Sequence, residues 1–401
     1  MPTLSNFTQF EGRYWDTASI RNALDYQGAK APHTGQPYSE AMLLGISGGV
    51  TFGYFTFHYK GYDPQVNLLT RNTFDPMERI FDRLKIPREL PRSGSADKAR
   101  QNLIRALEDG FAPIASPDGS LLPYNALPYD EANWYTMPLV IYGYEPDQGE
   151  AYLSDRSRVS LTVGAADLDK ARGRIKKDRH ALLLLGAPAE SMLADAIRQG
   201  LADCVKLMTE KPPKGSAKNF GLRALQQWAD MLEKTSRGSW AKEYPTGRPL
   251  LAALTTAYTF LGPAFGKTVQ AERDVYADFL DEAAQVLEST ALTEAAAKYR
   301  AAGESWQRLR ESLLPVDAPM LGDAREAIDR KTNLFIKSGA AQLNEIIAQR
   351  DRLEALKTEA ETDFALSEEE IKDLRADIRD KVLQTRNAEE AAVMALKAAI
   401  E

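Results

Sequence analysis

The side chains that could form a nucleophile and its base are few in this sequence. The chain of 401 residues has three histidines, His33, His58 and His180, and a single cysteine, Cys204. A disulfide needs two cysteines and a structural zinc site needs several Cys or His ligands, so both are excluded. Cys204 lies in the apolar helical context LADCVKLM, which predicts a buried thiol without a chemical role. We expect neither a metal site nor a cofactor.

Two glycine-rich segments could approach a phosphate or another ligand. GPAFGKT, at 262–268, has three residues between its glycines where a phosphate-binding loop needs four, so it predicts a turn between helices. GISGGVTFG, at 45–53, does not fit the dinucleotide fingerprint, but its glycines allow positive φ or a close backbone approach. This second segment predicts either a binding loop or a tight packing turn. Its candidate ligand-binding residues are Gly48, Gly49, Phe52 and Tyr54.

Three acidic residues could perform general acid–base chemistry, namely Asp16, Glu40 and Asp155. An apolar cleft would raise the pKa of a carboxyl group into the range that this chemistry requires. Surface or helix-capping carboxylates are the commoner explanation. Asp16 in particular is expected to cap a helix that begins at Thr17.

The elements that would position these groups are mixed in the first part of the chain. Helical patterns run over 17–26, 39–44 and 95–109, and Asp75-Pro76 marks a further helix start. The segments PLVIYGY (138–144) and AYLSD (151–155) predict an antiparallel hairpin, with VSLTV (159–163) as a third strand. Segregated helices and strands predict an α+β domain.

Helical periodicity dominates beyond Ala165. Proline and glycine interrupt it at 210–219 and 313–322, and Ser367 with Glu370 forms a capping box. The densely charged stretch 350–390 is typical of a solvated helical face packed on its own domain, although its thin apolar stripe could bind a partner helix. We predict an α+β domain over 1–165, a helical domain over 166–325, and charged helices over 326–401 that pack on or extend it.

Net charge and hydropathy exclude several classes of partner. The formal charge of −7 disfavours a nucleic-acid or anionic-membrane binder. No apolar stretch approaches the roughly 18 residues that a spanning helix needs, and the first residues lack the pattern of a secretory signal. We expect a cytoplasmic protein with no nucleic-acid or membrane partner.

Two segments of the first part carry a family resemblance. The helix near Trp15 matches the pattern HCxTxxLRNxLxxxG at Thr17, Ile20, Arg21, Asn22, Leu24 and Gly28. SEAMLLGISGGVTFGYF, at 39–55, matches a glycine-rich segment of the same family, and RDVYADFLDEAAQVL, at 273–287, followed by Trp306, resembles its accompanying helical domain. The sequence thus resembles the butirosin biosynthesis acyltransferase family from about residue 10 to about residue 309. The resemblance implies a papain-like amino-terminal domain followed by an all-α carboxy-terminal domain.

The same resemblance implies a catalytic Cys at the start of a helix, a His on a strand and an Asp on the next strand. A helix amino terminus and an imidazolium stabilise such a thiolate, which receives an acyl group from a carrier-protein thioester and passes it to an amine. In this chain Tyr14 and Trp15 stand at the His-Cys pair, Met137 stands at the His position, and Asp155 alone matches.

We therefore predict a catalytically inactive relative that binds a peptide, an acyl group or a partner protein in natural-product biosynthesis. The partner would be an acyl carrier protein or a biosynthetic enzyme subunit, and a homo- or hetero-oligomer fits this role. The expected ligand-binding residues of the first domain are Tyr14, Trp15, Asp16 and Met137. The alternative is an active acyl or aminoacyl transferase, or an amide hydrolase, that works without a Cys–His pair.

Overall fold

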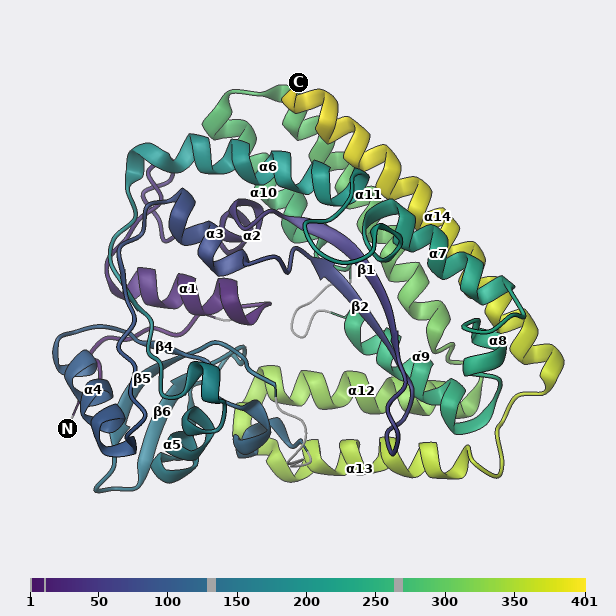
Figure 1. Cartoon of the computed structure of the whole chain (residues 1–401), viewed down its shortest axis with the longest axis horizontal. Coiled ribbons are helices and arrows are strands. Elements are labelled where there is room, and N and C mark those ends of the chain that lie inside the picture. The colour runs from purple at the N-terminus through teal and green to yellow at the C-terminus, as the bar shows by residue number, and fades with distance from the viewer. Residues whose placement is uncertain (1, 11, 128–134, 263–269) are drawn as a thin grey trace. The chain divides into compact units, whose positions relative to one another are not determined.

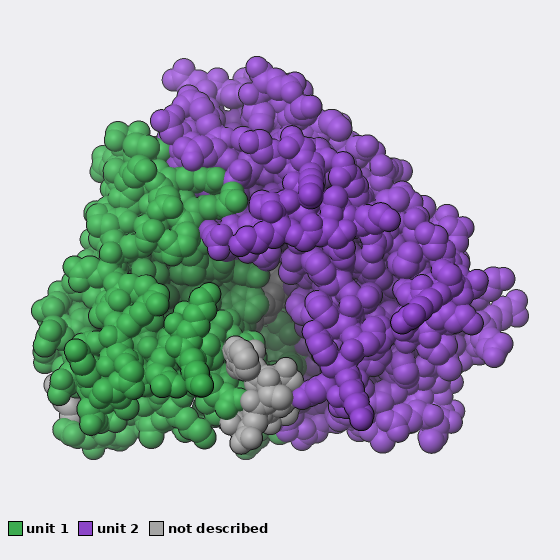
Figure 2. All heavy atoms as spheres, in the orientation of Figure 1, with its two compact units in different colours: residues 1–43, 77–193, 331–348 green, residues 44–76, 194–330, 349–401 purple. Residues whose placement is uncertain are grey.

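The computed structural model describes residues 2–10, 12–127, 135–262 and 270–401. The chain forms two compact units, each built from three separate segments (Figure 2). Unit 1 comprises residues 1–43, 77–193 and 331–348, and unit 2 comprises residues 44–76, 194–330 and 349–401. The domain limits at 165 and 325 are predicted from composition, whereas the two units are defined by contacts between residues. These limits therefore stay a prediction.

Unit 1 is the α+β part of the chain, as predicted. Its main helices are α1 (Trp15–Tyr26), α3 (Pro76–Arg83), α4 (Ala96–Glu108) and α5 (Ala165–Gly173). Its four-stranded sheet has the order β4 (Ile114–Ala115), β5 (Leu139–Glu145), β6 (Glu150–Ser154) and β7 (Leu161–Gly164). A short pair is formed by β3 (Arg88–Glu89) and β8 (Leu184–Leu185). Helices α1, α4 and α5 all pack against the four-stranded sheet (Figure 1).

The predicted hairpin is confirmed by the register of β5 and β6. These strands are antiparallel, with Val140 opposite Ser154 and Glu145 opposite Glu150. The apolar residues of β5 are almost all buried, which explains why this run is strongly hydrophobic. Strand β7 pairs with the other edge of β6, so the predicted third strand is confirmed as well.

Unit 2 is mainly helical. Its helices are α6 (Leu193–Thr209), α7 (Gly221–Glu233), α8 (Trp240–Glu243), α9 (Gly247–Leu261), α10 (Arg273–Leu287), α11 (Thr290–Leu313) and α14 (Glu368–Ile400). The predicted interruptions at 210–219 and 313–322 fall between α6 and α7 and after α11. Three more helices cross the limits between the units: α2 (Glu40–Ile46), α12 (Pro319–Ser338) and α13 (Leu343–Glu359). None of the helices within the described ranges is long and apolar enough to cross a bilayer.

A β-hairpin that the sequence did not predict lies among these helices. Strands β1 (Val50–Phe57) and β2 (Gln65–Arg71) pair in antiparallel register and pack on α7 and α9 (Figure 1). The side chains of Phe52 and Tyr54 enter the unit 2 core beside Trp228 and Trp306. The aromatic residues that follow the glycines are therefore core residues of a buried strand.

Helix α14 is the last helix of unit 2 and packs against other helices of that unit. The predicted capping box is present, since Ser367 accepts from the Glu370 backbone N–H and the Glu370 carboxylate accepts from Ser367. The apolar stripe of the helix, with Ile371, Ile378 and Val382, is buried in the core, and α14 packs along α7 and α11. A charged outer face packed on its own unit is thus confirmed for this helix.

A fully buried ion pair fixes the middle of α14. Arg273, the first residue of α10, contacts Glu389 at 2.6 Å, and both side chains are 0% exposed. The same guanidinium donates to the backbone carbonyls of Thr51 and Thr70 on the β1–β2 hairpin, at 2.9 and 2.6 Å. The hydrogen bonds therefore tie three elements, distant in sequence, to one cation.

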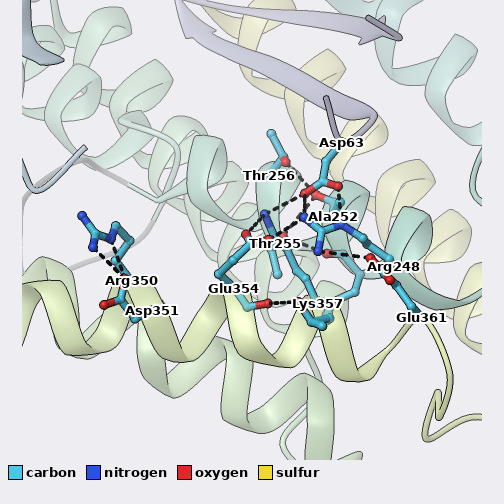
Figure 3. Close-up of polar contacts among 12 residues, drawn as sticks. Asp63, Arg248, Ala252, Thr255, Thr256, Arg350, Asp351, Glu354, Lys357 and Glu361 are labelled. Atoms are coloured by element: carbon cyan, nitrogen blue, oxygen red, sulfur yellow. Dashed lines mark hydrogen bonds and ion pairs between the residues drawn. The ribbon is translucent and has the colours of Figure 1, made fainter. Parts of the chain in front are cut away.

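The tip of the β1–β2 hairpin is held by a second, more exposed cluster (Figure 3). Asp63 accepts from Arg248 of α9 at 2.6 Å and from Lys357 of α13 at 3.1 Å. Arg248 also contacts Glu354 and Glu361. Burial by itself would raise the pKa of the Asp63 carboxyl, but the hydrogen bonds and charges of Arg248 and Lys357 outweigh burial and lower that pKa.

Candidate functional site

The start of α1 is the position at which the resemblance implies a nucleophile. The helix begins at Trp15, with Tyr14 as its N-cap residue and no capping bond from the Tyr14 side chain. The Glu40 carboxylate accepts from the backbone N–H groups of Arg13 and Tyr14, at 2.7 and 2.9 Å, and from Thr17 Oγ1 at 2.8 Å. The prediction that Asp16 caps a helix from Thr17 is wrong, because the helix begins at Trp15 and Asp16 lies inside its first turn.

Asp155 follows directly after β6. Because Val140 is opposite Ser154, continuing the register places Asp155 across from Leu139, two residues after Met137. Sheet pairing therefore brings the expected His and Asp positions to the same end of two neighbouring strands. This is the geometry that a base and its orienting acid would require.

Arg156 joins the acid to the start of α1. Its Nε lies 2.6 Å from Asp155 Oδ1, and its guanidinium lies over the ring of Trp15, 5.0 Å from the ring centroid. The guanidinium also lies over the ring of Phe335, 5.4 Å from the ring centroid. Such cation–π contacts are stabilising, and the ion pair of Arg156 with Asp155 is almost completely buried. We call Trp15, Tyr124, Asp155, Arg156 and Phe335 the Trp15 cluster.

Tyr124 completes the hydrogen bonding of Asp155. Its hydroxyl donates to Asp155 Oδ2 at 3.0 Å, and its ring stacks on Phe335 with centroids 5.8 Å apart. Burial, and secondarily the negative charge of Asp155, raises the pKa of Tyr124 well above its ordinary value. Tyr124 therefore stays a neutral donor at physiological pH.

Met137 packs against the 3-10 turn at Gly119–Leu121. It is 3% exposed, and a Cβ added to Gly119 would lie 2.9 Å from both Met137 Cε and the Tyr135 ring. Burial raises the pKa of Tyr135, which also experiences the charges of Arg156 and Asp155. The position at which the resemblance implies a base is thus occupied by an apolar side chain that fills space against a glycine.

The candidate residues of the glycine-rich segment lie in the other unit. A Cβ on Gly48 (φ +110°) would approach Asn72 Nδ2 to 2.6 Å, and a Cβ on Gly49 (φ +69°) would approach the Tyr276 ring to 2.5 Å. The turn therefore needs glycine both for its backbone and for close packing. Phe52 and Tyr54 are 0% and 1% exposed. The structure describes a packing turn here, and a ligand-binding role for Gly48, Gly49, Phe52 and Tyr54 stays a prediction.

The remaining sequence motifs give no further site. The thiol of Cys204 is buried, burial raises its pKa, and it contacts the Val50 carbonyl at 3.3 Å, as an inert core thiol should. The GKT segment at 263–268 lies outside the described residues. Across the described ranges, no group of three or more His, Cys, Asp or Glu side chains is placed to hold a metal ion.

Sequence reasoning missed three members of the Trp15 cluster, namely Arg156, Tyr124 and Phe335. Only Arg156 could have been predicted from the sequence, because a basic side chain directly after a candidate catalytic acid is placed to neutralise that acid. Tyr124 comes from a short 3-10 turn, and Phe335 comes from a segment about 180 residues after Asp155. No local sequence pattern predicts that Tyr124 or Phe335 contacts this cluster.

The fold and the position of this cluster define an α+β unit with a helix start beside the end of a hairpin. A comparison with known families agrees: residues 16–156 match the family model described as "Butirosin biosynthesis protein H, N-terminal". The match confirms the expected resemblance over those residues, which cover roughly a third of the chain, and the family is an acyltransferase-like family of biosynthesis proteins. No curated protein matches the chain.

Proposed function

We propose that this chain is a non-catalytic relative of the acyltransferase-like family and acts by binding a peptide, an acyl group or a partner protein at the Trp15 cluster. One observation carries the proposal: the acid that would orient a catalytic base is held by Arg156 and Tyr124. A guanidinium stays protonated in proteins and accepts no proton, so it cannot serve as the base. No side chain at these positions can act as the nucleophile or as the base of a Cys–His pair.

The composition of the cluster supports a binding role. The half-buried Trp15 and Tyr14 offer aromatic surface suited to an acyl chain or an apolar side chain, near the buried Met137. The indole Nε1 of Trp15 is buried with no hydrogen-bond partner among the described residues. A buried donor without an acceptor costs about 1–3 kcal/mol, which a ligand carbonyl at this nitrogen would recover. An acyl carrier protein or a biosynthetic enzyme subunit in the cytoplasm would present an acyl chain or an apolar side chain together with a carbonyl group.

A turnover experiment tests the loss of chemistry. The purified full chain is incubated with acyl pantetheine thioesters and an amine acceptor, and intact mass spectrometry follows adducts and products. We expect no acyl-protein adduct and no amide above the rate without protein. Amide formation that Asp155→Asn abolishes would overturn the proposal and favour an enzyme with a different set of catalytic residues.

A binding experiment tests the location. Calorimetric titration of the same thioesters should give saturable binding that Trp15→Ala weakens by about tenfold, which corresponds to about 1.4 kcal/mol. Tyr59→Ala is the matched control, because it removes an aromatic side chain that is 60% exposed in unit 2. Both variants should unfold cooperatively. Equal affinity of Trp15→Ala and the wild type would place the binding site elsewhere.

A further inference from the structure

A basic cavity on unit 1 is unusual for a chain with a formal charge of −7. It has a volume of about 450 Å³ and is lined by Arg92, Ser93, Gly94, Lys176, Lys177 and Arg179. Its lining thus includes four cations and no acid. Like charges that gather in a concave surface raise the local concentration of anions.

These cations are free to bind an anion. In the described part of the chain, Arg92, Lys176, Lys177 and Arg179 take part in no ion pair. Arg179 is half-buried, and its Nε is enclosed with no hydrogen-bond partner among the described residues. Because a buried unsatisfied donor is costly, an oxyanion that accepts from it would stabilise the unit.

An apolar cavity adjoins the basic one, and Arg92 lines both. It has a volume of about 220 Å³, and its apolar lining is Met77, Phe81, Leu90, Ile114, Ala181 and Leu183. Leu90 is 46% exposed, which is unusual for a leucine that borders an apolar cavity. Among the charged residues that line this cavity, Arg88 and Glu78 form an ion pair at 2.7 Å. Asp178 is the only other acidic residue of the described lining.

We propose that the two cavities together bind one free small anionic amphiphile, with a phosphate or similar oxyanion in the basic cavity and a short apolar chain in the apolar cavity. Their volumes fall within the range of small-molecule sites, about 300–1,000 Å³, when taken together. Charge complementarity selects the anionic head, and the acidic balance of the chain argues against a membrane surface as the source. The site shares no residue with the Trp15 cluster, so it does not depend on the proposed function.

The test uses octyl phosphate below its micelle concentration, with the full chain in a calorimeter. We expect one saturable site with an affinity about tenfold higher than that of inorganic phosphate, because the apolar chain adds buried area. Octyl glucoside, which has the chain and no charge, should bind more weakly than octyl phosphate. Raising the salt concentration should weaken the octyl phosphate complex, since its cations are largely exposed.

Variants separate the two halves of the site. Lys176→Gln/Arg179→Gln should weaken octyl phosphate and inorganic phosphate by a similar factor of about ten, whereas the exposed control Lys98→Gln should change neither. Leu90→Ser should remove much of the preference for octyl phosphate over phosphate, whereas Val159→Ser, at an exposed apolar residue of the same unit, should leave it intact.

Three results would overturn the inference. The first is wild-type octyl phosphate affinity in the Lys176→Gln/Arg179→Gln variant, if circular dichroism shows it folded. The second is equal affinity for octyl phosphate and inorganic phosphate. The third is binding to phosphatidic acid vesicles without binding to monomeric octyl phosphate, which would indicate a lipid surface as the partner.

Discussion

Both units bury arginine–carboxylate pairs, and two of these pairs, Arg273–Glu389 and Asp155–Arg156, have different surroundings. In unit 2, Arg273 and Glu389 are distant in sequence, and Arg273 also donates to carbonyls on both strands of the β1–β2 hairpin. In unit 1, Asp155 and Arg156 are neighbours in the chain, and the guanidinium also contacts the rings of Trp15 and Phe335 and the side-chain oxygen of Asn125. The first pair joins elements that must stay together, whereas the second lies where the sequence resemblance implies catalytic residues.

This difference teaches how to separate a structural pair from one that lies at a candidate functional site. A pair whose hydrogen bonds bridge distant elements contributes to the stability of the whole unit. A pair between adjacent residues restrains little of the chain, so its burial needs another explanation. For Asp155 and Arg156, that explanation is the helix start at Trp15, which the cation covers.

The largest effect is expected for the unit 2 pair. Arg273→Met leaves Glu389 buried without its cation, and we expect a loss of about 3–5 kcal/mol in the free energy of unfolding. Urea denaturation at pH 7 measures it. The double variant Arg273→Met/Glu389→Leu should lose less than Arg273→Met, because no isolated charge then remains. A double variant less stable than the single one would contradict this account.

A smaller effect is expected for the unit 1 pair. Arg156→Met removes the guanidinium, but Asp155 keeps the Tyr124 hydroxyl and the backbone N–H of residue 156 as donors. We expect a loss of about 1–3 kcal/mol in the same denaturation experiment. Lys30→Met is the control, since its ion pair with Asp25 is partly exposed and should contribute little. A loss as large as that of Arg273→Met would remove the contrast between the units.

The packing beside the unit 1 pair gives a third test. Gly119→Ala places a methyl group 2.9 Å from the Tyr135 ring and Met137 Cε, so we expect a loss of about 1–2 kcal/mol from overpacking. Gly94→Ala is the matched control, because a Cβ there meets nothing within 4 Å. Thermal unfolding followed by circular dichroism compares the two variants. Equal unfolding temperatures would show that the turn relaxes freely.

The smallest effect is expected for the partly exposed Asp63 cluster. Asp63→Asn should cost about 1 kcal/mol or less, because solvent and salt screen these charges. The pKa of Asp63 is lower in the folded protein, so its ionised form stabilises the fold above the unfolded value of about 3.9, and this stability is lost as the pH falls through the folded pKa. Wild-type stability should therefore fall more steeply than that of Asp63→Asn below about pH 4. Parallel pH profiles would contradict this assignment.

Local patterns in the sequence predicted local structure well. The β5–β6 hairpin, the helix breaks after α6 and α11, and the capping box at Ser367 each depend on residues within a few positions of one another. The Asp16 cap was wrong because the helix begins at Trp15, two residues earlier than predicted, so Asp16 lies inside its first turn. Of the candidate site, a motif in the sequence indicated Trp15, Met137 and Asp155, and their functional role stays a prediction.

Contacts between distant segments could not be predicted in the same way. Phe52 and Tyr54 follow glycines, a context shared by binding loops and by strands that pack closely. Both side chains pack beside Trp228, about 170 residues later, and a ligand-binding role for them stays a prediction. A single sequence holds no physical signal for that pairing, because nothing in the local pattern specifies which distant helix will cover the strand.

The order of the segments along the chain has a consequence for synthesis on the ribosome. Unit 1 receives its last segment, residues 331–348, only after most of unit 2 has been translated. Phe335 belongs to that segment and covers both Tyr124 and Arg156. A nascent chain that has emerged only as far as residue 193 therefore lacks Phe335, and Arg156 gains this aromatic neighbour only after a later helix has been synthesised.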